Sequence, residues 1–305
     1  MVARFATWNH SADPHDLGFM ITGLDHALIV CASIEDGEDL YSSVLGREPD
    51  WRSHDSGGSS SVIFQLENTA VEIMAPVGGG PLARRLHAMI DQDGPGLKSL
   101  IFATDSLEKD HALFDRRGLK PDEISQGEST DPYAGRARYW SRLRLDENAT
   151  HGVRIFALQR RKDDPLAYAP RDSAAVHALD HVVINTPNPD RAAALYGARL
   201  GLRLALDRSN PDWDMRLMFF RIGGLTVELA HRISAGFGSQ PDKLWGLSWR
   251  VPDIDAAHAR LEKAGIAITS IRAGRRPGSR VFTVRDHTLN VPTLILSAEP
   301  DNPAP

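Results

Sequence analysis

The chain has 305 residues, of which 42% are hydrophobic and 25% are charged, and its formal net charge is −5. These values are ordinary for a globular protein with one or two cores. The small negative charge gives no reason to expect nucleic acid or a membrane surface as a partner. Cys31 is the only cysteine, so no intramolecular disulfide can form. We therefore predict a cytoplasmic protein whose partner is a small molecule.

The two ends of the chain lack the periodic apolar pattern of a core element. Residues 1–20 have neither the basic start nor the apolar centre of a signal peptide. We interpret them as an N-terminal arm, either mobile or lying on a neighbouring subunit, which leaves a homodimer open. Residues 299–305 are polar and rich in proline, and we expect a loose tail.

A segment near the N-terminus recurs in the second half of the chain. The sequence "LDHALIVCASIEDGEDLYSSVLG" starts at Leu24, and "LDHVVINTPNPDRAAALYGARLG" starts at Leu179. Leu-Asp-His, Leu-Tyr and Leu-Gly stand at the same spacing in both. Each copy is typical of an apolar strand followed by a helix, which ends at Gly46 in one copy and at Gly201 in the other.

Two weaker copies start at Gly96 and Leu244, and their helices are predicted to end at Gly118 and Gly265. Alternating segments typical of strands follow each of the four starts, among them "AVEIM" and "TVELA". Short turns between these strands favour antiparallel pairing over one parallel βαβ array. The sequence therefore predicts an α+β protein of four βαβββ modules, grouped as two similar halves.

A charged stretch with two prolines, "RRKDDPLAYAPRDSAA", separates the halves and is typical of an exposed connection. We expect this linker at residues 161–175. The first domain is then predicted at residues 21–160 and the second at residues 176–298.

These modules resemble those of the vicinal oxygen chelate superfamily, which includes glyoxalase I, extradiol dioxygenases, methylmalonyl-CoA epimerase and bleomycin-resistance proteins. The resemblance covers residues 21–297 and is most specific in the two Leu-Asp-His segments, "AVEIM", "TVELA" and "VPDIDAAHARLEKAG". It implies two glyoxalase-like domains, each with a cupped mixed sheet around a cavity and helices on the outer face. It is specific for the fold and not for the reaction, because this fold supports many chemistries.

Metal-binding members of the superfamily place a ligand on the first strand of a module and a carboxylate on its last strand. His26 and Glu72 match these positions in the first module, and His181 and Glu228 match them in the third. The second and fourth modules depart from the pattern, and the corresponding positions hold Ser99, Phe156, Gly246 and Thr293.

A divalent catalytic metal usually has three or four protein ligands. Each cavity would receive one His-Glu pair, whether the modules pair consecutively or exchange between the halves. An ion of Fe, Mn, Ni, Zn or Mg would need recruits such as His54, His231 or His287, and strand alternation places His231 opposite Glu228. We expect the metal-free state, in which each pair satisfies its own hydrogen bonds. The His-Glu pairs remain the candidate catalytic residues. Alternatively, each pair supplies two ligands to a metal site that has few protein ligands.

Basic and apolar residues alternate in "GRARYWSRLRLD". Arg138, Trp140 and Arg142 share one face, which turns toward the cavity if the apolar face packs under a helix, and Arg154 on the next strand joins them. Guanidinium groups bind carboxylate or phosphate, and Trp140 could stack on a planar ligand. The alternative is a solvated face paired with acidic residues of the chain.

Two classes of function remain open. The first is an enzyme that acts on a small oxygen-bearing, anionic substrate at a His-Glu site, with or without a metal, by proton transfer beside a carbonyl or by ring opening of an aromatic diol. Ring opening is disfavoured because Gly246 and Thr293 replace two members of the ligand set that the resemblance implies. The alternative is a metal-free binding protein of the bleomycin-resistance type, which sequesters a small molecule without changing it.

Overall fold

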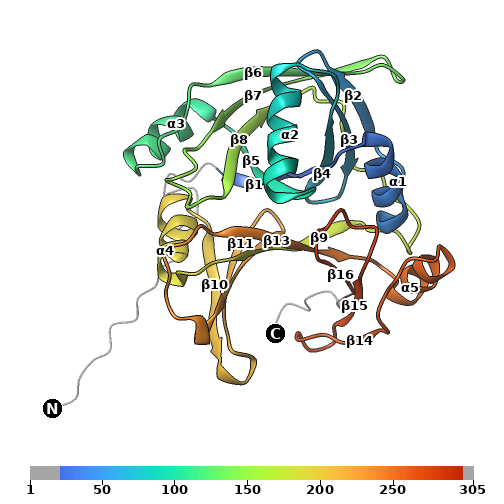
Figure 1. Ribbon diagram of the computed structural model, residues 1–305, viewed down its shortest axis with the longest axis vertical. Coiled ribbons are helices and arrows are strands. Elements are labelled where there is room, and N and C mark those ends of the chain that lie inside the picture. The colour runs from blue at the N-terminus through green and yellow to red at the C-terminus, as the bar shows by residue number, and fades with distance from the viewer. Residues whose placement is uncertain (1–20, 298–305) are drawn as a thin grey trace.

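The computed structural model describes residues 21–297, so the predicted arm and tail lie outside the described residues. Its strands form two eight-stranded sheets, one from each half of the chain (Figure 1). The strand orders are β2-β3-β4-β1-β5-β8-β7-β6 and β10-β11-β12-β9-β13-β16-β15-β14. The two orders are equivalent, which confirms the α+β fold of four βαβββ modules. Consecutive modules share a sheet, so the halves do not exchange modules.

The first sheet contains β1 (Ile21–Val30), β2 (Trp51–Asp55), β3 (Ser59–Gln65), β4 (Ala70–Pro76), β5 (Gly96–Thr104), β6 (Ser125–Asp131), β7 (Arg136–Arg144) and β8 (Arg154–Arg160). The second contains β9 (Ala178–Asn185), β10 (Arg203–Asn210), β11 (Met215–Ile222), β12 (Leu225–Arg232), β13 (Lys243–Arg250), β14 (Arg272–Ala273), β15 (Arg280–Val284) and β16 (Thr293–Ser297). The α-helices are α1 (Ile34–Leu45), α2 (Pro81–Asp93), α3 (Leu107–Arg116), α4 (Pro189–Ala193) and α5 (Ile254–Lys263). Helix α4 continues as a π-helical turn, η2 (Ala194–Arg199).

The ends of the repeated helices follow the local sequence. Ser33, Asn188 and Asp253 cap α1, α4 and α5, because each side chain accepts a hydrogen bond from a backbone N–H of the first turn. The four predicted glycine stops all have positive φ, from 69° to 83°, at Gly46, Gly118, Gly201 and Gly265. A side chain would strain this backbone conformation, which explains glycine at the end of each helix.

Helix α2 is an addition to the predicted modules. Its first turn contains Pro81, which suits a helix start because proline has no N–H to leave unpaired. The helix buries Ala83 and Leu86, contacts β4 and β1, and crosses in front of the first sheet in Figure 1. None of the helices within residues 21–297 is both long and apolar enough to cross a membrane.

Alternating apolar residues decide which face of each sheet is covered. Ala27 and Ile29 on β1, and Val182 on β9, are fully buried in one continuous core together with Tyr41 of α1. Because this core runs through both halves, the covered faces of the two sheets pack toward each other. A hydrogen bond also joins the two halves, since Arg260 Nη2 of α5 donates to the Val44 carbonyl oxygen of α1 at 3.0 Å. The opposite face of each curved sheet is called the inner face below.

The two sheets differ in how their edges meet. In the first half β2 contacts β6, and Trp51 Nε1 donates a hydrogen bond to Ser129 Oγ at 2.9 Å. Leu166 of the linker packs against Trp51 on the same side, so the linker is less exposed than its composition predicts. In the second half the edge strand β10 is exposed over nearly its whole length. The inner face of the second half is therefore the more open one.

Candidate functional site

A β-bulge on the first strand of each half brings an aspartate beside the histidine. On β1 the pairing with β5 skips Asp25, between Leu24 and His26. The same shift on β9 leaves Asp180 unpaired in the ladder, beside His181. A bulge interrupts the alternation of side chains between the two faces. Aspartate and histidine are consecutive in the sequence, and both nevertheless reach the inner face.

His26 lies between two carboxylates. Its Nδ1 is 2.7 Å from Asp25 Oδ1, and its Nε2 is 3.3 Å from Glu72 Oε2. Glu72 pairs with Leu28 on the neighbouring parallel strand, which makes it a diagonal neighbour of His26. The side chains of His26 and Glu72 are 14% and 15% exposed, so solvent reaches both, whereas Asp25 is 5% exposed. Asp25 also accepts hydrogen bonds from Arg160, which completes a chain of four charged or titratable groups.

Electrostatic interactions favour charge on each member of this chain. Burial opposes the charge on His26, but the hydrogen bonds and charges of Asp25 and Glu72 outweigh it and raise the pKa of His26. Burial also opposes ionisation of the carboxyls, yet His26 and Arg160 hold the pKa of Asp25 well below its usual range. His26 and the Ser61 hydroxyl likewise lower the pKa of Glu72. The arrangement favours an imidazolium held between two carboxylates.

The second half repeats the arrangement, except that the arginine comes from a different strand. His181 Nδ1 lies 2.8 Å from Asp180 Oδ1, and its Nε2 lies 3.5 Å from Glu228 Oε2. Arg250 Nε donates to Asp180 Oδ2 at 2.8 Å. Burial opposes ionisation of Asp180, but His181 and Arg250 bring the pKa of that carboxyl to about 2. Arg250 is on β13, beside β9, whereas Arg160 of the first half is on β8. The same aspartate contact is thus made from non-equivalent strands.

The second and fourth modules contribute no further donors of this kind. Ser99 and Phe156 stand at the positions that the sequence predicts. In the fourth module the prediction of Thr293 is wrong by one residue, because Leu294 pairs with the inner-face residue Ser248. Gly246 has no room for a side chain, since a Cβ there would lie 2.6 Å from the Pro292 carbonyl oxygen.

The proposed recruits for a metal site lie apart from the His-Glu pairs. His54 Nδ1 is 2.6 Å from Ser60 Oγ, and His287 Nδ1 is 2.9 Å from Asp286. His231 is buried, with its Nδ1 3.0 Å from the Thr186 carbonyl oxygen, on the face opposite Glu228. Among residues 21–297, no group of three or more His, Cys, Asp and Glu side chains lies together as metal ligands. One histidine and one carboxylate in each half do not fit the usual three or four ligands.

Consecutive pairing places the arginine face in the same sheet as His26. Arg138 is buried and donates to both oxygens of Asp164 at 3.0 to 3.2 Å, so its hydrogen bonds are used within the chain. Its guanidinium carbon lies 5.8 Å from the ring centre of Trp140. Arg142 lies 5.9 Å from the ring centre of Phe156 and forms no ion pair with any described residue. Of this set, Arg142 is the most available to a ligand.

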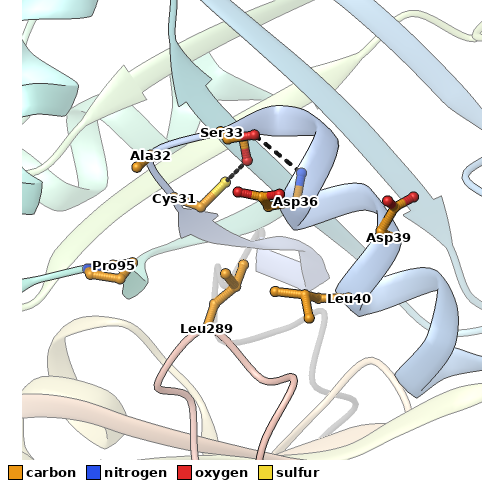
Figure 2. Close-up of a pocket in the computed structure, with 8 residues that line it drawn as sticks. All are labelled: Cys31, Ala32, Ser33, Asp36, Asp39, Leu40, Pro95 and Leu289. Atoms are coloured by element: carbon orange, nitrogen blue, oxygen red, sulfur yellow. Dashed lines mark hydrogen bonds between the residues drawn. The ribbon is translucent and has the colours of Figure 1, made fainter. Parts of the chain in front are cut away.

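A cleft of about 380 Å³ lies elsewhere, where β1 meets α1 (Figure 2). Its lining residues are Cys31, Ala32, Ser33, Asp36, Asp39, Leu40, Pro95 and Leu289. Cys31 belongs to the core between the sheets, so the cleft opens on the side of β1 opposite His26. Burial raises the pKa of the Cys31 thiol to about 12, which makes it a poor nucleophile. The cleft is therefore separate from both His-Glu pairs.

Comparison with known proteins agrees with the fold. The family model of the glyoxalase-like domain matches residues 24–201, which is more than half of the chain. A second model, of the glyoxalase/bleomycin resistance protein/dioxygenase superfamily, matches residues 180–283. The protein is thus of the vicinal oxygen chelate class. Within that class, the chain belongs to the glyoxalase-like domain family.

Individual relatives share parts of this fold. An ethylmalonyl-CoA/methylmalonyl-CoA epimerase from Cereibacter sphaeroides is 30% identical over 97 residues, which are 30% of this chain and 72% of the epimerase. A mutant 4-hydroxymandelate synthase from Streptomyces coelicolor is similar with a TM-score of 0.65 at 15% identity, over 92% of this chain and 95% of that chain. A halotolerant catechol dioxygenase has a TM-score of 0.59 at 14% identity, over 93% and 90%. At such identities the structural matches show the fold alone.

Proposed function

We propose that this protein is an enzyme that transfers a proton at a carbon beside a carbonyl group, in a small anionic substrate, with His26 and Glu72 as the acid-base pair. The observation that carries the proposal is the distance of 3.3 Å between His26 Nε2 and Glu72 Oε2, with the other ring nitrogen held by Asp25. Two partly exposed groups that exchange protons, side by side, are what such a reaction requires.

Each group has one role in the proposed reaction. Glu72, kept ionised by its neighbours, accepts the proton as the C–H bond breaks. The electron pair moves onto the carbonyl oxygen, and His26 Nε2, kept protonated, donates a hydrogen bond to the resulting enolate. Protonation of the enolate carbon on its opposite face gives the epimer and on the same face regenerates the substrate, so no oxidant or reductant is consumed. No step is assigned to a metal, since the donor set of each half falls short of a metal site.

The first half is the proposed site because its sheet also contains Arg142 and Arg154, which could hold the anionic group. Arg138 and Trp140 lie on the same face of β7 as Arg142, where Arg138 forms an ion pair with Asp164 and contacts the Trp140 ring. The name of the similar epimerase gives ethylmalonyl-CoA and methylmalonyl-CoA as its substrates. This similarity favours, as the substrate, an acyl thioester with a free carboxylate.

A second function, binding of an apolar small molecule without reaction, is favoured by the inner face of the second half. Trp245 is 50% exposed there, and Leu206 is 49% exposed and pairs with Phe219, the strand neighbour of Glu228. A ligand that covers this apolar surface would remove it from water, which is favourable. Quenching of Trp245 fluorescence by apolar ligands, compared with a Trp245→Phe variant, would reveal such binding.

The test of the proposed reaction is deuterium exchange at the substrate carbon, followed by ¹H NMR in D₂O with methylmalonyl-CoA, ethylmalonyl-CoA and the free acids. We expect Glu72→Gln and His26→Gln to slow exchange by about a hundredfold or more. Glu108→Gln, an exposed position on α3, is the matched control and should exchange at the wild-type rate. Glu228→Gln is assayed as a fifth protein. Equal rates in all five would overturn the proposal, and a loss confined to Glu228→Gln would move it to the second half.

Parallel samples are assayed with EDTA and after exposure to Fe, Mn, Ni, Zn and Mg, with elemental analysis of the washed protein.

The cytoplasmic location and the homodimer stay predictions from the sequence. Cell fractionation and light scattering after size-exclusion chromatography test them.

A further inference from the structure

A second pair of bulges lies on β5 and β13, the strands beside β1 and β9. The pairing of β5 with β1 skips Lys98, and the pairing of β13 with β9 skips Trp245. The preceding residues, Leu97 and Leu244, pack against the core between the sheets. The bulge interrupts the alternation there, so Lys98 and Trp245 reach the inner faces together with the residues that follow them, as Asp25 and Asp180 do on the neighbouring strands. Lys98 occupies in the first half the position that Trp245 has in the second.

Lys98 is a largely buried residue whose ammonium group lacks a close partner within the described chain. It is 7% exposed, and it forms no hydrogen bond or ion pair with another residue of the described chain. Burial lowers the pKa of Lys98, Asp93 opposes this shift, and Arg154 adds to it by repulsion between like charges. The Lys98 Nζ is not among the fully buried side-chain atoms without a partner, so the ammonium group reaches solvent and is open to contact by an anion.

The neighbouring side chains on this face are also basic. Arg154 is the strand partner of Ser99, the residue after Lys98. Its Nε lies 3.3 Å from Glu147 Oε1, and its terminal nitrogens donate no hydrogen bond to any residue within 21–297. Arg142, on the next strand, lies over Phe156 without an ion pair of its own among these residues. Phe156 in turn pairs with Ile101, the strand partner of His26.

We propose that Lys98, Arg154 and Arg142 form an anion-binding subsite on the inner face of the first half, which holds a carboxylate or phosphate group of the substrate. The three cations lie on β5, β8 and β7, and His26 and Glu72 lie on the neighbouring strands β1 and β4. One bound molecule can therefore place its anion on the cations and its reacting carbon beside Glu72. The assignment of the anion to the substrate rests on the proposed function. In the second half, Trp245 replaces the central cation, and no anion is bound at the equivalent place.

The test measures binding without turnover, by calorimetric titration with two probes, inorganic phosphate and malonate. We expect Lys98→Met and Arg154→Gln each to weaken binding by about tenfold, the loss of one charge-assisted contact. Lys98→Arg should retain most of the affinity because it keeps the charge. Lys109→Met, on the exposed side of α3, is the matched control and should bind as the wild type does. The probe that binds more tightly identifies the anion as carboxylate or phosphate.

Folding is checked in the same samples by thermal melting. Since the Lys98 ammonium group has no partner within the described chain, Lys98→Met should melt close to the wild-type temperature. Wild-type affinity of the Lys98→Met variant for both probes would overturn the subsite.

The same variants separate this inference from the proposed reaction. His26→Gln and Glu72→Gln should lose proton exchange yet bind malonate or phosphate with the affinity of the wild type. Lys98→Met should raise KM more than it lowers kcat, as expected for a contact made equally in the ground and transition states. Loss of anion binding in Lys98→Met, with unchanged exchange in His26→Gln, would keep the subsite and reject the reaction. The reverse result would reject the subsite alone.

Discussion

Arg160 donates two hydrogen bonds to the Asp25 carboxylate, from Nε at 2.5 Å and from Nη2 at 2.9 Å. Asp25 is thereby fixed on the inner face, where it holds His26 by Nδ1 and leaves Nε2 directed at Glu72. The aspartate is a positioning residue, since it touches the histidine and lies on the side away from Glu72. Its counterpart Asp180 is held by an arginine from a different strand, which shows that the two halves reach one geometry by separate contacts.

Removal of the Asp25 charge should lower the pKa of His26, because the carboxylate stabilises the imidazolium form. In Asp25→Asn the ring should titrate at lower pH than in the wild type, as followed by ¹H–¹⁵N NMR of the imidazole. Asp180→Asn should leave the His26 titration unchanged. A His26 titration identical in Asp25→Asn and wild type would show that the carboxylate does not govern the ring.

Loss of Arg160 should destabilise the fold, because Asp25 is only 5% exposed and would lose one of its two cationic partners, with only His26 remaining. We expect Arg160→Gln to lower the free energy of unfolding by about 2–3 kcal/mol, below the range for a fully buried pair because the arginine is partly exposed. Urea denaturation measures the change. The double variant Arg160→Gln with Asp25→Asn should recover part of the loss, whereas strictly additive losses would mean that the two groups are not coupled.

Asp110 on α3 should make stability depend on pH. It is fully buried, and neither carboxyl oxygen has a hydrogen-bond partner in the part of the chain that the structure describes. Burial raises the pKa of Asp110 to about 6. The folded state therefore holds a proton that the unfolded state releases near pH 4, so stability falls as the pH rises from about 4 to about 6.

The variant Asp110→Asn removes this titration. Relative to the wild type, it should gain about 3 kcal/mol in the free energy of unfolding between pH 4 and pH 7. Chemical denaturation at a series of pH values measures the difference. A constant difference across this range would mean that Asp110 titrates normally in the folded state.

The closed end of the first sheet should depend on Leu166. This linker residue is 8% exposed and packs with Trp51, Ile63 and Ala70. Leu166→Ala should cost about 2–3 kcal/mol of unfolding free energy, through lost burial and the cavity left behind. Leu206→Ala, at an exposed leucine of the second half, should change it by less than about 0.5 kcal/mol. Similar costs at both sites would contradict the difference in closure between the halves.

Local patterns in the sequence determined the modules and the two His-Glu pairs. The repeated Leu-Asp-His starts, the capping residues and the glycine stops act over a few neighbouring residues, so they can be read without knowledge of the fold. Glu72 and Glu228 follow from strand alternation, because their apolar neighbours must face the covered side of the sheet. The family resemblance then relates each glutamate to the histidine on the first strand of its module.

Only the tertiary structure decided what surrounds each pair. Alternation alone would place Asp25 opposite His26, and it is the bulge that brings them together. The bulge arises from the pairing of β1 with a strand some 75 residues away, and a shift of one residue in such pairing moves a side chain to the other face. A second bulge in the same pairing brings Lys98 to the inner face. The register of β13 with β16 places Leu294 where Thr293 was predicted. Ion pairs such as Arg138 with Asp164 likewise depend on where distant segments meet, which no local pattern specifies.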